Sequence, residues 1–124
     1  MASPVIYLIE NDAAVRSAVR RLLMPLQRRV RAFASAEQFL RDVDRGAAGC
    51  LILDMSLPGM TGLQLQERLN ESEWALPVIF TTAHDDEQWR DVALRKGALA
   101  YLRKPFDGEL LLTAVRNAMA ALPS

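Results

Sequence analysis

The residue best suited to carry chemistry is Asp54, which directly follows the apolar run Cys50–Leu53 and precedes a Pro58-Gly59 turn. A short apolar run bounded by a turn is typical of a strand buried on both faces of a parallel sheet. Asp54 is then expected at the carboxyl end of a central strand, where ligands of open α/β sheets bind. An unpaired buried carboxylate is costly, so it does not serve a core. Taken alone, an Asp that simply starts a turn explains the pattern about as well.

Polar residues also follow three other predicted strands: Glu10 and Asn11 after the first, Thr82 at the end of the fourth, and Lys104 after the fifth. Each has an ordinary explanation, as a residue that starts a helix, a strand residue or a solvated cation. Gathered at one sheet edge, the set suits phosphoryl transfer to Asp54, the nucleophile of an acyl phosphate. Mg²⁺ held by oxygen ligands would offset the repulsion between this carboxylate and the incoming phosphoryl group. The Thr82 hydroxyl and the Lys104 ammonium would then bind phosphoryl oxygens.

Hydrophobic periodicity predicts five strands that alternate with five helices. The strands are expected at Val5–Ile9, Val30–Phe33, Cys50–Asp54, Pro77–Thr82 and Ala98–Leu102. The helices are expected from Ala13 to Met24, from a Ser35 cap to Gly46, from a Thr61 cap, from an Asp85 cap to Gly97, and from an Asp107 cap to about Ala121. The alternation predicts an α/β fold with a doubly wound parallel sheet in the order 2-1-3-4-5. Arginines flank the second strand, as suits a sheet edge.

The same periodicity assigns side chains to faces. In the last helix, the residues expected to face the core are Leu110, Leu111, Val115 and Met119. In the first helix, the residues that lie off the apolar stripe and are expected to be solvated are Arg16, Arg20 and Arg21. Asp12 is expected to cap that helix.

The composition predicts one globular domain over residues 1–124. Fifteen basic and fifteen acidic residues cancel, so no overall charge favours nucleic acid or an anionic membrane. The single cysteine, Cys50, cannot form an internal disulfide and is expected in the core. Because there is no signal-like N-terminus and no apolar run of membrane-spanning length, a cytoplasmic protein is expected.

Over essentially its whole length, the chain resembles a response-regulator receiver domain of two-component signalling, in the FixJ-like subgroup. The resemblance is carried by the acidic end of the first strand, by Leu-Asp-Met-Ser-Leu-Pro-Gly-Met-Thr-Gly around Asp54, by Thr82-Ala83 and by Lys104-Pro105-Phe106. It implies the flavodoxin-like receiver fold and a phosphoryl group accepted by Asp54 from a sensor histidine kinase. It also implies a switch domain rather than an enzyme with an external substrate.

The resemblance further assigns a phosphoryl-binding switch group, which is Thr82, Ala83, Lys104 and Tyr101. In the family the aromatic residue at the Tyr101 position turns inward as the threonine moves, and the Lys104–Pro105 bond is usually cis. The fourth helix, fifth strand and fifth helix form the signalling surface, often a dimer interface. Trp89 belongs to that surface or is a half-buried packing residue. The effector is expected to be transcriptional, with DNA contacted only through an output domain absent from this chain.

The metal ligands that the resemblance implies are Glu10, Asn11, Asp54 and the backbone carbonyl of Ser56. The family usually has two acidic residues where this chain has Glu10-Asn11. Because Asn11 offers only a neutral carbonyl oxygen, we expect weak Mg²⁺ binding and slow phosphorylation. His84 lies where the family tunes the lifetime of the phosphoryl group, although an exposed loop histidine is the ordinary explanation.

Two other functions compete with a phosphorylation switch. Loss of the second acidic residue at Asn11 is compatible with an atypical receiver that acts as a phosphorylation-independent protein–protein interaction module. A phosphatase or dehalogenase would also use a strand-end aspartate, but such hydrolases place a second acid two residues later, where this chain has Ser56. A chain of 124 residues also leaves no room for their cap domain.

Overall fold

The computed structural model describes residues 4–83 and 87–122 and has strands and helices in the predicted alternation. The strands are β1 (Val5–Ile9), β2 (Val30–Phe33), β3 (Gly49–Asp54), β4 (Val78–Thr82) and β5 (Ala100–Arg103). The helices are α1 (Ala13–Leu23), the short 3-10 helix η1 (Met24–Leu26), α2 (Ala36–Asp42), α3 (Gly62–Glu71), α4 (Glu87–Arg95) and α5 (Gly108–Ala120). None of these described helices is long and apolar enough to cross a membrane.

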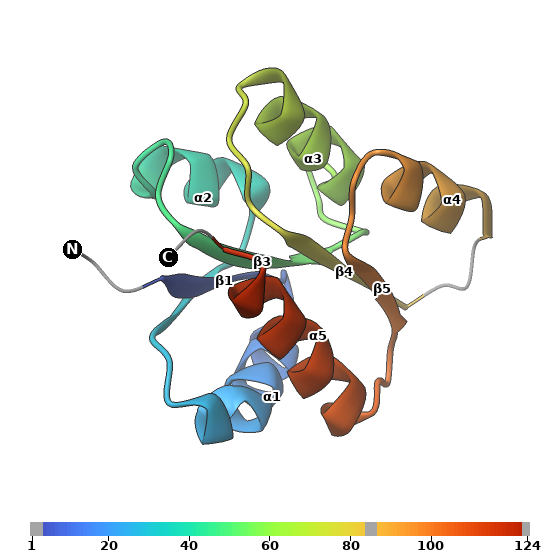
Figure 1. Ribbon diagram of the computed structural model, residues 1–124. Coiled ribbons are helices and arrows are strands. Elements are labelled where there is room, and N and C mark those ends of the chain that lie inside the picture. Colours follow the sequence, from blue (N-terminus) through green and yellow to red (C-terminus); the bar gives the residue numbers. More distant parts are fainter. Residues whose placement is uncertain (1–3, 84–86, 123–124) are drawn as a thin grey trace.

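The strands form one parallel sheet in the order β2-β1-β3-β4-β5, which confirms the predicted topology. Helices α2, α3 and α4 cover one face of the sheet, and α1 and α5 cover the other (Figure 1). After β2 has been added on one side of β1, the chain returns to add β3, β4 and β5 on the other side, so the strand order reverses between β1 and β3, which is the switch point of a doubly wound sheet. The ends of β1 and β3 therefore lie side by side, with Ile9 opposite Leu53.

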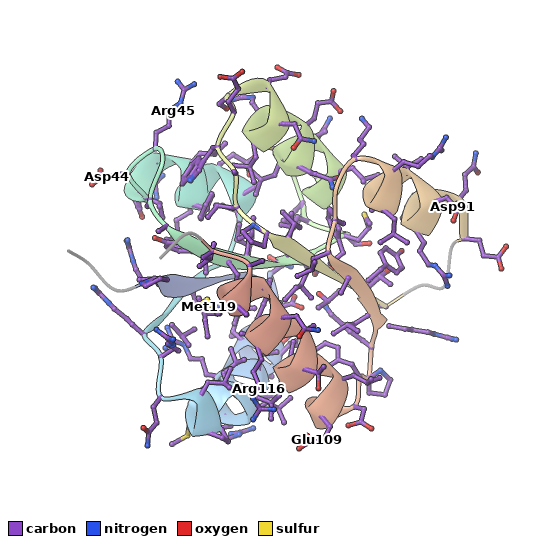
Figure 2. All side chains as sticks on the ribbon, in the orientation of Figure 1. Asp44, Arg45, Asp91, Glu109, Arg116 and Met119 are labelled. Carbon is purple, nitrogen blue, oxygen red and sulfur yellow. The ribbon has the colours of Figure 1, made fainter. Side chains whose placement is uncertain are left out.

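The sheet separates two hydrophobic cores, because successive side chains of a strand point to opposite faces. Along β1, Tyr7 belongs to the core under α2–α4, whereas Ile6 belongs to the core under α1 and α5. Phe39 organises the first core: its ring stacks on Trp74 with the centroids 5.5 Å apart and meets Tyr7 edge-on. Side chains fill the space on both sides of the sheet, while Arg116 and Glu109 of α5 are exposed (Figure 2). Burial on both faces explains the unbroken apolar runs of the sequence.

The predicted helix starts are confirmed wherever the structure describes them. The side chains of Asp12, Ser35, Thr61 and Asp107 each accept a backbone N–H of the helix that follows. The start of α3 is a complete capping box, in which the first and fourth residues bond to each other's backbone, because Gln64 also accepts the N–H of Thr61 at 2.9 Å. Gln38 instead accepts the N–H of Ala34, so the box at Ser35 is only half formed. The predicted Asp85 cap lies outside the described residues.

The predicted end of α2 at Gly46 is wrong, since the helix stops at Asp42. Val43 turns to an extended conformation (φ −108°, ψ 130°) and buries its side chain, and Gly46 closes a separate turn. The end of α4 is as predicted: Gly97, with φ +102°, follows the helix, and the N–H groups of Gly97 and Ala98 bond back to its last turn. Because Ala98 takes part in that motif, β5 begins at Ala100 rather than at Ala98.

The prediction that Leu110 faces the core is also wrong, because this side chain is 57% exposed. The buried stripe of α5 contains Leu111, Leu112 and Val115. Leu110 lies about 100° around the helix from Leu111, which rotates it into solvent.

Cys50 is fully buried, as predicted. Burial raises the pKa of its thiol to about 12, so it stays protonated and packs as a small apolar group.

Gly62, the first residue of α3, packs closely against the end of β3. A Cβ at this position would lie 2.6 Å from the carbonyl oxygen of Asp54 and 3.0 Å from Cε1 of Phe80. We predict that Gly62→Ala lowers the free energy of unfolding by about 1–3 kcal/mol, measured by urea denaturation, because backbone has to move. Gly108→Ala is the matched control, since its Cβ meets only the end of the Leu22 side chain. Equal stability of the two variants would contradict the prediction.

Candidate functional site

Asp54 ends β3 and is almost completely buried, with 5% of its surface exposed. Its Oδ1 accepts the N–H of Ser56 at 3.1 Å, and its Oδ2 lies 3.4 Å from the Lys104 ammonium. The N–H of Met55 bonds to the carbonyl of Thr81, which continues the pairing of β3 with β4 just beyond the carboxylate. The side chain of Asp54 is therefore held by the Ser56 N–H, and the backbone directly after it is held by β4.

Lys104 lies just after β5 and joins three strand ends. Its N–H donates to the carbonyl of Thr82 at 2.6 Å, and its ammonium forms an ion pair with Glu10 while facing Asp54. The lysine side chain is only 18% exposed. The bond to Pro105 is cis, as predicted. Lys104 is therefore the shared cation of two buried carboxylates.

Glu10 follows β1 and is 3% exposed. Its N–H bonds to the carbonyl of Phe33 in β2 at 3.0 Å, which aligns the residue with the sheet. Its Oε2 accepts the N–H of Asp12 at 3.0 Å, and Asp12 in turn caps α1. The same carboxylate therefore links the start of α1 to Lys104.

The electrostatics of the cluster disfavour a charged Asp54. Burial raises the pKa of Asp54, and the neighbouring Glu10 carboxylate raises it further, whereas the Ser56 N–H and the Lys104 ammonium lower it. The net effect is a pKa above the ordinary value of 3.8. The site thus holds a carboxylate in a low-dielectric setting, where one cation compensates two acids.

Asn11 and Ser56 lie at the exposed rim of this cluster. The Asn11 side chain has no hydrogen-bond partner among residues 4–83 and 87–122, and these residues contain no metal-binding group of three or more His, Cys, Asp or Glu side chains. The oxygen atoms of Glu10, Asp54 and Asn11, with the Ser56 carbonyl, are nevertheless the hard donors that Mg²⁺ prefers. These donor types fit a magnesium site that has two acidic side chains, Glu10 and Asp54.

The remaining candidate switch residues differ in their surroundings. Thr82 is fully buried, and Ala83 directly after it is exposed. Tyr101 is partly buried, with its ring centroid 6.4 Å from that of Phe80. Trp89 on α4 is 42% exposed, and His84 lies outside the described residues.

Two side chains outside the predicted site, Arg16 and Glu37, form hydrogen bonds to the backbone of its loops. Nη1 of Arg16 donates to the carbonyls of Glu10 at 2.7 Å and Asn11 at 3.0 Å, so the prediction of a simply solvated Arg16 is wrong. Glu37 accepts the N–H of Met60 at 3.0 Å, and this hydrogen bond lowers the pKa of Glu37. Helical periodicity places Arg16 off the apolar stripe, and only a search for acceptors before the helix start could have found its role.

The family of the chain is established by comparison with known proteins. Residues 6–116 match the family model described as the response regulator receiver domain. The chain therefore belongs to the response-regulator receiver family. Such domains receive phosphate from sensor kinases, generally bind Mg²⁺ at the phosphorylation site and are generally not enzymes with external substrates.

Relatives of the chain are response regulators, several of them named as transcriptional regulators. Response regulator protein TmoT of Ectopseudomonas mendocina is 41% identical over 119 residues, which cover 96% of this chain and 54% of TmoT. Transcriptional regulatory protein TdiR of Thauera aromatica is 39% identical over 116 residues, or 93% of this chain and 51% of TdiR. FixJ of Bradyrhizobium diazoefficiens is 31% identical over 114 residues, or 92% of this chain and 56% of FixJ. The chain spans about half the length of these curated relatives.

Solved structures agree with this assignment. Response regulator StyR superposes with a TM-score of 0.89 at 36% identity, covering 96% of this chain and 60% of the StyR chain. FixJ-N superposes with a TM-score of 0.85 at 26% identity, covering 100% of this chain and 99% of that chain. The receiver fold and the FixJ-like resemblance are confirmed.

The raised pKa of Asp54 predicts that its charge destabilises the fold. We predict that Asp54→Asn increases the free energy of unfolding at pH 7 by about 1 kcal/mol or more, since Lys104 keeps Glu10 as its partner. A carboxyl group whose pKa is raised in the folded state does not destabilise the fold at a pH below its unfolded-state pKa, near 3.8. The loss of stability develops as pH rises above that value, because the group then ionises more readily in the unfolded chain. Denaturant titrations of both proteins between pH 4 and pH 8 measure the difference. A gain that shrinks as pH rises would contradict this reasoning.

Proposed function

We propose that this chain is the phosphoacceptor switch of a response regulator, with Asp54 as the residue that accepts the phosphoryl group from a sensor histidine kinase. The observation that carries the proposal is the convergence of Asp54, Glu10 and Lys104 at one sheet edge in a chain of the receiver family. A carboxylate oxygen of Asp54 attacks phosphorus, a P–O bond forms, and the P–N bond to the kinase imidazole breaks. The leaving imidazole takes a proton from solvent.

Lys104 has two tasks in this reaction. Before transfer, its ammonium favours the ionised, nucleophilic form of Asp54 against the effect of burial. After transfer, it pairs with a phosphoryl oxygen, a stronger acceptor than the Glu10 carboxylate it held before. The buried Thr82 supplies a hydroxyl donor to the same group, and Ala83 supplies backbone beside it.

Mg²⁺ bound in this site offsets the negative charge of the carboxylates and the phosphoryl group. Glu10, Asp54, the Asn11 side-chain carbonyl and the Ser56 backbone carbonyl are the ligands we propose. Because Asn11 contributes no charge, the site binds Mg²⁺ weakly, and phosphorylation is slow at low Mg²⁺.

The added charge, roughly −1.5 to −2 at pH 7, shifts the surface formed by α4, β5 and α5. Tyr101 and Thr82 couple the phosphoryl group to this surface, which includes the half-exposed Trp89 and supports a homodimer. The effector is transcriptional and lies in a further domain, as the lengths and names of the relatives suggest. Contact with DNA is made through that domain.

One observation favours a second function. Asn11 gives the proposed metal site one negatively charged ligand fewer than the family usually has. This suits an atypical receiver that signals by protein–protein contact without phosphorylation. The two functions differ in whether Asp54 is modified when Mg²⁺ is present, so one experiment separates them.

We predict that incubation with acetyl phosphate and Mg²⁺ adds one phosphoryl mass to the protein, measured by intact-mass spectrometry. The shift is expected to disappear in Asp54→Asn and on removal of Mg²⁺ with EDTA. Lys104→Ala is expected to lower the modified fraction, because the phosphoryl oxygens lose their ammonium partner. A mass shift that persists in Asp54→Asn would refute Asp54 as the acceptor.

We also predict that Asn11→Asp lowers the Mg²⁺ concentration at half-maximal phosphorylation at least about tenfold, because it adds a charged oxygen ligand. Its side chain is exposed and has no described partner, so the fold is expected to tolerate the change. Ser17→Asp, an added acid on the exposed surface of α1, is the control for general electrostatics. If the native chain is not modified and Asn11→Asp is, the atypical receiver replaces the switch.

A further inference from the structure

Arg16 is bonded to the backbone of the proposed site, although it is part of α1. One nitrogen, Nη1, donates to the carbonyl oxygens of both Glu10 and Asn11, at 2.7 and 3.0 Å. We propose, on the basis of the function proposed above, that Arg16 is a positioning residue for Mg²⁺ binding. Its guanidinium fixes the Glu10–Asn11 turn, so that the Glu10 carboxylate stays beside Lys104 and the Asn11 amide stays at the rim.

The hydrogen bonds of the turn show why it depends on Arg16. The N–H of Glu10 is held by Phe33 of β2, and the N–H of Asp12 is held by the Glu10 side chain. The carbonyl of Asp12 accepts the N–H of Arg16 as the first bond of the helix. The carbonyls of Glu10 and Asn11 precede the cap, so the amides of α1 do not serve them. Only the Arg16 side chain, among the described residues, bonds to these two oxygens.

The stability of α1 does not explain a cation at this place. The start of a helix carries partial positive charge, which disfavours a cation in its first turns. Ordering a long arginine side chain also costs conformational entropy. Two charge-assisted hydrogen bonds to carbonyls offset both costs, and they exist only because the turn is held in this conformation.

The Glu10–Asn11 turn is connected to Asp54 through Lys104. Arg16 bonds to the Glu10 backbone, the Glu10 carboxylate pairs with Lys104, and Lys104 lies 3.4 Å from Asp54. The Asn11 side chain has no described partner of its own, so its position depends on the backbone that Arg16 holds. Loosening the turn therefore misplaces two of the four proposed ligands.

Positioning and simple electrostatics predict opposite signs. Removing a positive charge near a cation site tightens Mg²⁺ binding by reducing repulsion. Loss of positioning weakens it, because the ligands must be ordered when the ion binds. A weaker site in a variant that has lost a positive charge is thus a signature of positioning.

The test is an Mg²⁺ titration of the ¹⁵N-labelled chain without phosphodonor, followed by backbone amide NMR. We expect the Kd for Mg²⁺ to rise about tenfold in Arg16→Ala and to recover in part in Arg16→Lys, which keeps a cationic donor. Arg20→Ala is the matched control: Arg20 lies one turn further along α1, is exposed and has no described partner. The Arg20→Ala variant is expected to have an unchanged or slightly lower Kd for Mg²⁺.

A second readout separates this inference from the function on which it rests. In Arg16→Ala without Mg²⁺, we expect the ¹³C shift of the Glu10 carboxylate and the ¹⁵Nζ shift of Lys104 to move, while Arg20→Ala leaves both unchanged. If the native chain binds no Mg²⁺, the function fails and these shifts still decide the role of Arg16. Unchanged shifts, or an unchanged or tighter Mg²⁺ Kd in folded Arg16→Ala, would overturn the proposal.

Discussion

The Lys104 ammonium between the buried carboxylates of Glu10 and Asp54 is the interaction on which the rest of the site depends. Two acids cannot share a poorly solvated sheet edge without a cation between them. The sheet order places the ends of β1 and β3 side by side, and Lys104 must reach them from β5, past the end of β4. A long, flexible side chain with a compact charge meets this requirement, and it can also leave one acceptor for a stronger one.

Most of the fold follows from the sequence because its signals are local and agree with one another. Unbroken apolar runs predicted strands buried on both faces, and capping residues such as Asp12 and Thr61 predicted where helices begin. Helix ends were harder to predict. Gly46 looked like the end of α2, yet Val43 leaves the helix earlier because an extended backbone buries its side chain. The prediction for Leu110 was wrong because three consecutive leucines of a helix cannot all face one core. Periodicity alone did not say which of the three would face solvent.

The candidate site was predictable as far as strand ends determine it. The polar residues at the carboxyl ends of β1, β3, β4 and β5 could be assembled from topology alone, and the structure brings Glu10, Asp54 and Lys104 into contact. Contacts that cross from a helix to a loop could not be predicted in this way. Arg16 and Glu37 each bind backbone groups of a site loop, and no residue pattern distinguishes such a side chain from a solvated one.

The two cores described above share no helix, because α2, α3 and α4 lie on one face of the sheet and α1 and α5 on the other (Figure 1). Substitutions in one layer should therefore add to those in the other with little coupling energy, as expected for distant sites without common partners. The carboxyl-end edge of the sheet is the exception. Arg16 of α1 and Glu37 of α2, which lie on opposite faces, both form hydrogen bonds to the backbone of loops at this edge. The strand ends are therefore the place where a change in one layer can be transmitted to the other.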